Sequence, residues 1–549
     1  MSGTGTGVLI VGAGPTGLTM ACELARRGVP FRIIDKAAAP SDKSKAFGIH
    51  ARTMEVFENM GLIDSVLDEG NICNGFDIYD RGRALASLSF SSIESKYPYL
   101  LILAQSDTER VLNERLESYG AKVEREKELV HIDRGGETLV SHVRRPDGSE
   151  ETIRSSYVSG CDGAHSSVRH ILGFEFKGAP YPNYWLLADC NLDWEYPFHH
   201  LSAFIHPNGI TAYFPLYKDR GRLMFELQDA PVTEEMPEPT LDDVKRLMAE
   251  REIKYKSVTD PNWLAYFKLH HRMVDRYAEG RIFLAGDAAH IHSPMGGQGM
   301  NTGIQDAYNL AWKLALVLEG RGAYSLLDSY QAERLPVGKE VVSLTDKATR
   351  MAGVHNPVLG AIRNKVIGVA SRINAVQDRL LATLAQIEIH YKESPIVSEK
   401  WYQPDTVEGY HGYRDDLTAG ERVRDYSLKG PDGGGTLYGL LGNGLHNLLL
   451  FTGGDPEDME LDELRKIHDA AAAEYGGVMA VHVIAGPRGV PEDFRHMSSV
   501  WNDGDLRMHK DFGAARASLY LVRPDGYVGF RNQPASRDDL EEYLAGIFR

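Results

Sequence analysis

Three glycines and one acid near the N-terminus have the types and spacing of a dinucleotide-binding site. Gly12, Gly14 and Gly17 form a GxGxxG pattern, and Asp35 follows 18 residues after the last of them. The first glycine permits a sharp turn, the second lets backbone N–H groups approach a pyrophosphate, and the third allows a helix to pack closely on a strand. An acid at this distance would accept hydrogen bonds from a ribose. The pattern predicts a dinucleotide site and leaves NAD(P) and FAD both open.

A second group of residues that could do chemistry lies between positions 286 and 315. Asp287 follows an apolar run, and Pro294 precedes three closely spaced glycines, Gly296, Gly297 and Gly299. Bare backbone in front of a helix leaves N–H groups free for a ligand, and the helix N-terminus stabilises negative charge there. The pattern predicts a helix that begins at about residues 301–302 with its positive end toward a ligand.

Apolar periodicity supplies the elements that would position these groups. Val8–Val11 and Phe31–Ile34 have the pattern of buried parallel strands, and a helical repeat lies between them. Residues 177–276 alternate in a way that indicates a β-rich segment. In the C-terminal third, the pattern predicts a strand, a helix, a second strand, a hairpin turn and a final helix: Leu448–Phe451, Leu464–Tyr475, Val478–Ile484, Pro524–Gly526 and Leu540–Phe548.

Composition narrows the function classes. The 549 residues include 60 Lys and Arg against 77 Asp and Glu, and the resulting net charge of −17 argues against a nucleic-acid partner. The four cysteines form no CxxC pair, which suits a cytoplasmic protein, and we expect no signal peptide and no membrane span. His290 and His292 lack a carboxylate or a third ligand nearby, so we predict packing or hydrogen-bonding roles and no metal site.

Three further stretches occur with these two in a recognisable order. They are SKAFGIHARTMEVFENMGL (residues 44–62), QSDTERVLNERLESYG (105–120) and GCDGAHSSVRHILG (160–173). Together the five stretches resemble the class A FAD-dependent aromatic hydroxylases, the family of p-hydroxybenzoate hydroxylase and phenol hydroxylase, over nearly the whole chain. The resemblance implies non-covalently bound FAD, with NADPH or NADH as a transient co-substrate.

The resemblance also assigns residues to FAD. It implies that Asp162 and Asp287 lie near the ribityl chain and phosphates, and that Gln105 touches the flavin side. The family usually has arginine where this chain has Lys45, and lysine keeps the charge but loses the bidentate geometry. The full set of expected FAD contacts is Gly12, Gly14, Pro15, Thr16, Gly17, Asp35, Lys36, Lys45, Gln105, Asp162, Asp287, Pro294, Gly297, Gly299, Met300 and Asn301.

The flavin ring is expected along residues 294–301, with Pro294 and Gly297 in the catalytic positions. By the resemblance, NAD(P)H reduces the flavin and a C4a-hydroperoxide then transfers oxygen to a phenolic or polycyclic aromatic ring. A closed apolar pocket would protect that species from water. Three alternatives remain: a Baeyer–Villiger monooxygenase or flavin oxidase on the same fold, a non-catalytic flavin-binding scaffold, and a plain NAD(P)-dependent dehydrogenase, which leaves residues 286–315 unexplained.

We expect an α/β protein with three parts. A Rossmann-type FAD-binding domain would comprise residues 1–176 and, with a helical region, 277–400; a β-rich substrate domain would be inserted at 177–276; and a thioredoxin-like domain would follow at 401–549. All four cysteines precede residue 191, so the last domain cannot do dithiol chemistry, and we expect it to serve packing or dimerisation. The protein is expected to be a monomer or a homodimer.

Aromatic residues of the β-rich segment could face a flat substrate, although many would simply fill a sheet core. Tyr213 and Phe225 are the predicted substrate contacts from this segment, and Phe47 and Ile49 are those from the segment near Lys45. Some phenol hydroxylases have an acid at the position of Phe47, which helps to ionise the phenol. This chain must use another partner, such as a histidine or tyrosine, or react with the un-ionised phenol. The substrate, the position hydroxylated and the choice between NADH and NADPH are not determined by these patterns.

Overall fold

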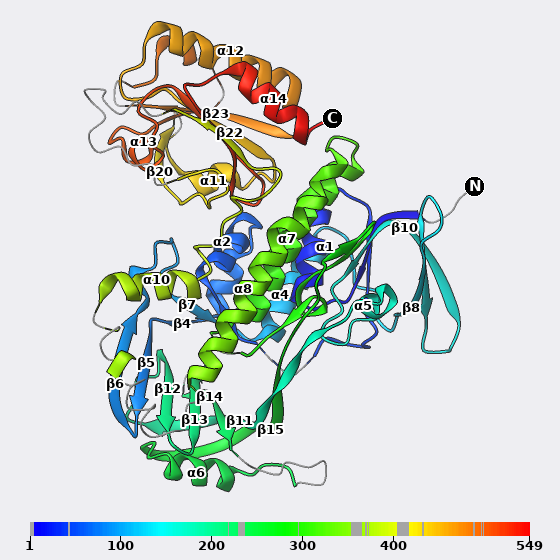
Figure 1. Cartoon of the computed structure of the whole chain (residues 1–549), viewed down its shortest axis with the longest axis vertical. Helices are drawn as coiled ribbons and strands as arrows, with labels where there is room; N and C mark the ends of the chain where they lie inside the picture. The colour runs from blue at the N-terminus through cyan, green and yellow to red at the C-terminus, as the bar shows by residue number, and fades with distance from the viewer. Residues whose placement is uncertain are drawn as a thin grey trace.

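The computed structural model describes residues 5–41, 44, 46–217, 219–228, 237–294, 296–352, 365–367, 371, 373–402, 417–430, 433–486, 489–495, 497 and 499–549. None of the helices in these ranges combines the length and apolar character needed to cross a bilayer. Three large sheets organise the chain, and Figure 1 shows the C-terminal one set apart above the other two.

The first sheet carries the predicted nucleotide-binding motif. Its strands run in the order β16-β17-β10-β1-β2, with β10 also pairing to the β8–β9 hairpin. β1, β2, β10 and β17 are parallel, so their carboxyl ends lie along one edge, where ligands bind in open α/β sheets. The bounds are β1 (Gly5–Val11), β2 (Phe31–Ile34), β8 (Glu128–Asp133), β9 (Leu139–Arg144), β10 (Glu150–Gly160), β16 (Ala278–Glu279) and β17 (Ile282–Leu284).

Helices cover this sheet and complete the first domain. The central pair is α1 (Pro15–Arg26) and α7 (Gln298–Leu318), which pack against one another, and α4 (Gln105–Ser118) packs on α1. A separate short sheet has the order β3-β7-β4. The remaining elements are β3 (Gly48–Ile49), α2 (Ala51–Asn59), α3 (Ile63–Glu69), β4 (Asn71–Cys73), β7 (Leu100–Ile102), α5 (Ser167–Leu172), α8 (Asp328–Ala352) and α10 (Asn374–Leu384).

The second sheet has the order β18-β15-β11-β14-β13-β12-β5-β6. It contains the predicted β-rich segment but also two strands from before residue 176, because β5 pairs in parallel with β12. α6 (Leu241–Glu250) covers one face of this sheet (Figure 1). The strands are β5 (Gly75–Asp80), β6 (Arg83–Ser89), β11 (Lys177–Trp194), β12 (His200–His206), β13 (Gly209–Pro215), β14 (Arg220–Leu227), β15 (Tyr255–Met273) and β18 (His290–Ile291).

The third sheet forms the C-terminal domain. Its core order is β26-β25-β22-β23, with β22 and β23 parallel and β25 antiparallel to β22, an arrangement compatible with a thioredoxin-like domain. Its elements are β19 (Ser398–Trp401), β20 (Ser427–Gly430), β21 (Gly433–Thr436), α11 (Leu437–Leu441), β22 (His446–Phe451), α12 (Asp458–Tyr475), β23 (Met479–Ala485), β24 (Val500–Asn502), α13 (Arg507–Asp511), β25 (Ser518–Val522), β26 (Val528–Gln533) and α14 (Arg537–Ile547).

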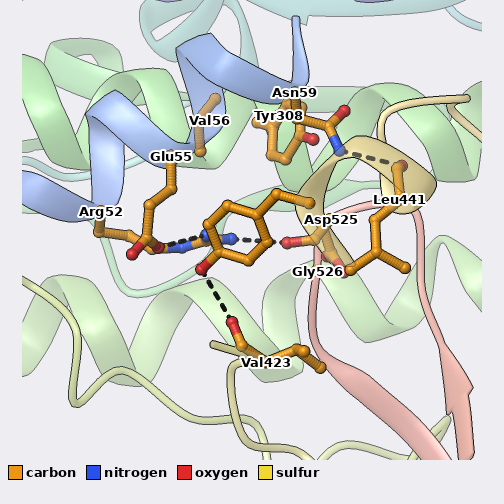
Figure 2. A pocket seen from close by; sticks show the side chains of 10 residues that line it. Arg52, Glu55, Val56, Asn59, Tyr308, Val423, Leu441, Asp525 and Gly526 are labelled. Carbon is orange, nitrogen blue, oxygen red and sulfur yellow. Dashed lines mark hydrogen bonds and ion pairs between the residues drawn. The ribbon is translucent and has the colours of Figure 1, made fainter. Parts of the chain in front are cut away.

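The C-terminal domain is joined to the first domain by buried polar contacts. Figure 2 shows Arg52 of α2 reaching the hairpin turn between β25 and β26, where its Nη2 donates to the backbone oxygen of Asp525 at 2.6 Å. Arg52 and Arg422 both pair with the buried Glu55, at 3.0 and 2.7 Å. These contacts hold the C-terminal domain against α2, the helix that follows His50 in the sequence.

Candidate functional site

The turn after β1 has the tight geometry that its glycines predict. Gly12 has φ +100°, and a Cβ there would lie 2.4 Å from the backbone oxygen of Cys161. A Cβ at Gly17 would lie 2.0 Å from the oxygen of Gly12. Both positions therefore require glycine, because no side chain can share space with the backbone.

Gly14 differs from its two neighbours, since a Cβ at this position would meet nothing within 4 Å. It is also the N-cap of α1, and as a glycine it has no side chain to occupy the first N–H groups of that helix. An empty space in front of uncapped N–H groups is the geometry that a pyrophosphate needs. The residues present here fit FAD.

Pro15 and Thr16, the first two residues of α1, hold the start of the helix in place. Pro15 takes the position where its missing N–H costs least. Thr16 fits between two glycines, because a Cβ at either Gly286 or Gly303 would lie 2.5 Å from its Oγ1. The start of α1 is thereby packed against both the turn after β17 and α7.

Asp35 supports the same turn from the end of β2. Its Oδ2 accepts the N–H of Ala13 at 2.7 Å, and its Oδ1 accepts the N–H of Ala37 at 2.8 Å. Lys36 next to it is exposed. The carboxylate of Asp35 thus lies beside the glycine turn, where a ribose hydroxyl would meet it.

Asp162 has one engaged oxygen and one free oxygen. Its Oδ2 accepts the N–H groups of Ser167 and Val168 at 2.6 and 3.2 Å, which caps α5. Its Oδ1 is buried and has no hydrogen-bond partner among the described residues, and this burial raises the pKa of Asp162. A buried oxygen without a partner is costly unless a ligand supplies a donor. Asp162 therefore fits a role as acceptor for a hydroxyl of FAD.

Arg169 has a structural position in the same segment. Its guanidinium donates to the backbone oxygens of Ala164 and Ala288, at 2.8 and 3.1 Å, and lies 4.0 Å from the ring centre of Phe176. Buried in this way, it ties the segment after β10 to the turn after β17.

Asp287 and Gln105 lie at the edges of this region. Asp287 is exposed, in the short 3-10 turn Gly286–Ala288 that follows β17. Gln105 begins α4, where its Nε2 donates to Glu109 Oε1 at 2.8 Å and its backbone N–H donates to Ala46 at 2.9 Å. Lys45, the predicted departure from the family pattern, lies outside the described residues.

The glycine-rich segment ends in a helix that begins earlier than predicted. Gly297, in the left-handed conformation at φ +63°, is the N-cap of α7, and its N–H donates to Pro294 at 2.9 Å. Gly299 and Met300 consequently lie in the first turn of α7 instead of before the helix, and Asn301 lies in the same turn. The glycine N-cap cannot use a side chain to satisfy the first N–H groups of α7, so they remain available to the electron-rich edge of a flavin.

Asn301 connects this helix to the segment before α2. Its Nδ2 donates to the oxygens of Gly48 and Gly297, at 2.7 and 2.8 Å, and its Oδ1 accepts the N–H of His50 at 2.9 Å. The imidazole Nε2 of His50 donates to the oxygen of Gly296 at 2.7 Å. Burial lowers the pKa of His50 to about 4, so the ring is neutral at physiological pH. Two distant segments are thus locked together beside the predicted ring position.

A cavity of about 700 Å³ adjoins this point and is lined almost entirely by apolar side chains. One wall is a face of the second sheet, with alternate residues of β5, β6, β12 and β13 directed into the cavity, such as Ile78, Ala203 and Ala212. The opposite wall is α10 with part of α8, and the end nearest the predicted flavin ring is formed by His50, Gly296 and Gln298.

The predicted substrate residues divide between this cavity and the cores around it. Phe47 is buried and contacts the cavity-lining ring of Phe214 edge-on at 4.8 Å, and Ile49 is fully buried in the core of the first domain. Tyr213 borders the cavity, but its ring packs edge-on against Trp194 at 4.3 Å in the cluster under α6. Phe225 lies in that same cluster and does not line the cavity. The lining residues of β5, β6 and α10 were not among the residues predicted from the sequence.

The chain is similar to known FAD-dependent monooxygenases and hydroxylases. The family model described as "FAD binding domain" matches residues 5–345. The chain is 32% identical to the 6-methylpretetramide 4-monooxygenase of Streptomyces rimosus, over 99% of this chain and 94% of that protein. It is 30% identical to the pentachlorophenol 4-monooxygenase of Sphingobium chlorophenolicum, over 95% and 93% of the two chains. The solved structure of the anhydrotetracycline hydroxylase OxyS from Streptomyces rimosus superposes with a TM-score of 0.75 at 29% identity, covering 99% of each chain.

Proposed function

We propose, from the premise that this chain belongs to the FAD-dependent aromatic monooxygenases, that it hydroxylates an apolar, fused-ring phenol at the expense of NAD(P)H. The observation that carries the proposal is the cavity of about 700 Å³ whose inner end is formed by His50, Gly296 and Gln298. This volume is within the range of pockets that enclose drug-sized ligands. Two relatives of the chain are named for multi-ring substrates, 6-methylpretetramide and anhydrotetracycline, and one is named for a single ring, pentachlorophenol. The size of the cavity favours the larger class.

The polarity of the cavity wall specifies the substrate further. The described lining residues include no carboxylate, lysine or arginine, and the titratable ones are His50, Tyr99 and Tyr213. Burial lowers the pKa of His50 and raises the pKa values of both tyrosines, so all three are neutral near pH 7. A charged substrate would lose its hydration here without gaining a partner. The substrate is therefore neutral when it enters, and any phenolate must be stabilised within its own ring system.

Each part of the site then has a defined task. FAD, which the glycine turn after β1, Asp35 and Asp162 would hold, would supply the activation of O₂ after its reduction by NAD(P)H. The glycine-capped N-terminus of α7 stabilises negative charge on the ring edge, and the apolar walls exclude water. His50 holds the Gly296 carbonyl by a hydrogen bond and thereby fixes the peptide at the border between ring and cavity. NAD(P)H binds transiently, in a surface groove.

Filling the cavity tests this assignment. Ala203→Trp places an indole on the sheet wall of the cavity, and we expect kcat/KM for fused-ring phenols to fall by about tenfold or more, since a pocket that is too small excludes its substrate. FAD content should be unchanged. The assay measures phenol-stimulated NAD(P)H oxidation and the incorporation of ¹⁸O from ¹⁸O₂ into product.

Ala249→Trp is the matched control, because Ala249 is exposed on α6, away from the cavity. It should leave turnover unchanged. The proposal fails if no phenol of one to four rings stimulates NAD(P)H oxidation, or if Ala203→Trp turns over the largest substrates as fast as the parent protein.

A further inference from the structure

Gln386, directly after α10, has a backbone conformation that its side chain does not favour. Its φ is +60°, in the left-handed region that glycine usually occupies. Its N–H donates to Thr383 at 3.1 Å, and the next N–H, of Ile387, donates to Ala382 at 3.1 Å. This is the hydrogen-bonding pattern of a helix C-terminus that normally ends in glycine. A non-glycine residue is strained in this conformation, and contacts of its side chain can offset the strain.

The amide of Gln386 is buried in a cluster with three residues of α7. Its Nε2 donates to Gln298 Oε1 and, at 3.0 Å, to Thr302 Oγ1, while its Oε1 accepts Gln305 Nε2 at 2.6 Å. Gln386 is 2% exposed and Gln305 is 4% exposed. Hydrogen bonds in such a buried cluster are strong, and each one that is broken leaves a buried polar atom unpaired.

The same cluster reaches the backbone beside the predicted flavin ring. Gln298 Nε2 donates to the oxygens of Leu384 and Gly296, at 2.9 and 3.2 Å. On the other side, the N–H of Arg52 donates to the oxygen of Ala385 at 3.2 Å. The end of α10 is therefore bonded both to the first turn of α7 and to the start of α2.

α10 is also a partition between two cavities. Leu380, Leu381 and Leu384 face the apolar cavity, whereas Arg379, Ala382 and Thr383 face a second, polar cavity of about 820 Å³ next to the C-terminal domain. Gln298 lines both cavities. The helix that forms the wall of the substrate cavity is thus attached at its end to the helix that faces the flavin.

We propose that Gln386 is a positioning residue, through which α10 holds the N-terminal turn of α7 at the correct distance from the flavin ring. Its amide fixes Gln298 and Thr302, and Gln298 in turn fixes the peptide of Gly296. The inference rests on the placement of the ring along residues 294–301 in the proposed function. Gln386 thus affects the stability of the reduced flavin although its own side chain does not contact FAD.

Gln386→Gly tests the inference in the FAD-loaded protein without any substrate. Glycine suits φ +60° better than glutamine does, so the backbone of α10 is relieved while the amide is removed. We expect the midpoint potential of the bound flavin to become more negative, with reduced FAD bound about threefold more weakly relative to oxidised FAD, because the helix N-terminus stabilises the reduced anion less well. The visible circular dichroism of the flavin should change with it.

Two control variants make the result specific. Arg81→Gly relieves the same backbone conformation, φ +47°, in an exposed turn and should leave the flavin unchanged. Gly299→Ala places a methyl group in the first turn of α7, 3.5 Å from the His292 ring, without touching the amide cluster. If Gly299→Ala shifts the potential and Gln386→Gly does not, the positioning role is overturned; if neither variant shifts it, the placement of the ring fails instead. If Gln386→Gly does not fold, Gln305→Leu replaces it. This substitution removes the hydrogen bond from Gln305 to Gln386, and the same shift in midpoint potential is expected.

Discussion

Gly14→Ala is expected to weaken FAD binding by roughly 10–100-fold while the protein stays folded. The new methyl group meets no protein atom within 4 Å, so the apoprotein should fold normally. It does enter the space in front of the uncapped N–H groups of α1, and those groups can then no longer reach a pyrophosphate. The measurement is a titration of apoprotein with FAD, followed by quenching of flavin fluorescence.

Gly135→Ala is the matched control. Gly135 also has open space around it, but it lies in the exposed turn between β8 and β9, and this substitution should leave FAD affinity unchanged. A Gly14→Ala protein that binds FAD as tightly as the parent would mean that the pyrophosphate lies elsewhere.

Glu333→Ala is expected to lower the free energy of unfolding by about 3–5 kcal/mol, because it leaves buried charges uncompensated. Glu333 is fully buried on α8 and pairs with Arg523 and Lys313, at 2.7 Å each. Arg523 belongs to the C-terminal domain, and it also pairs with Asp525 in the hairpin turn. The substitution therefore breaks the network that attaches the C-terminal domain to α7 and α8. Equilibrium unfolding in urea measures the change.

The pH dependence of stability supplies a second readout of the same network. Burial alone would raise the pKa of Glu333, but Arg523 and Lys313 outweigh burial and hold it well below its usual value. Arg523 is the partner of Glu333 that keeps its positive charge more securely, because burial lowers the pKa of Lys313 to about 8. The stabilisation is complete above the pKa of an unfolded glutamate, about 4.3, and is lost as the pH falls below it. Glu333→Ala should remove this part of the acid sensitivity.

Glu250→Ala is the control for Glu333→Ala. Glu250 pairs with Arg246 on the exposed side of α6, and exposed pairs contribute at most about 1 kcal/mol. If the two substitutions cost the same, the interdomain network has no special role in stability.

Local patterns predicted the nucleotide-binding half of the fold well. β1, α1 and β2 occur where periodicity places them, because each element is short and its register is set by neighbouring residues. In the C-terminal domain, β22, α12, β23, the β25–β26 hairpin and α14 were predicted for the same reason, whereas β19, β20, β21, α11, β24 and α13 were not predicted. The start of α7 was placed about three residues too late, since Gly297 in a left-handed conformation caps the helix and the following glycine at 299 is accepted within it.

The apolar cavity was harder to predict, because it depends on pairing between distant segments. The parallel pairing of β5 with β12 joins residues more than a hundred positions apart, and nothing in either stretch specifies its partner. Strand alternation identifies the two faces of a sheet but not which face meets the ligand. The large Phe225 was therefore predicted as a substrate contact, although Ala212 lines the cavity and Phe225 does not. The amide cluster around Gln386 also has no signal in sequence, because its members come together only when the turn after α10 meets the first turns of α7.

The most direct test of the whole account is a crystal structure of the FAD-loaded protein. We expect the adenosine end between Gly12 and Asp35, and the isoalloxazine ring along residues 294–301 with one edge facing the first turn of α7 and the other facing the cavity beside His50. An isoalloxazine ring that lies away from this cavity would contradict the proposed function at its foundation.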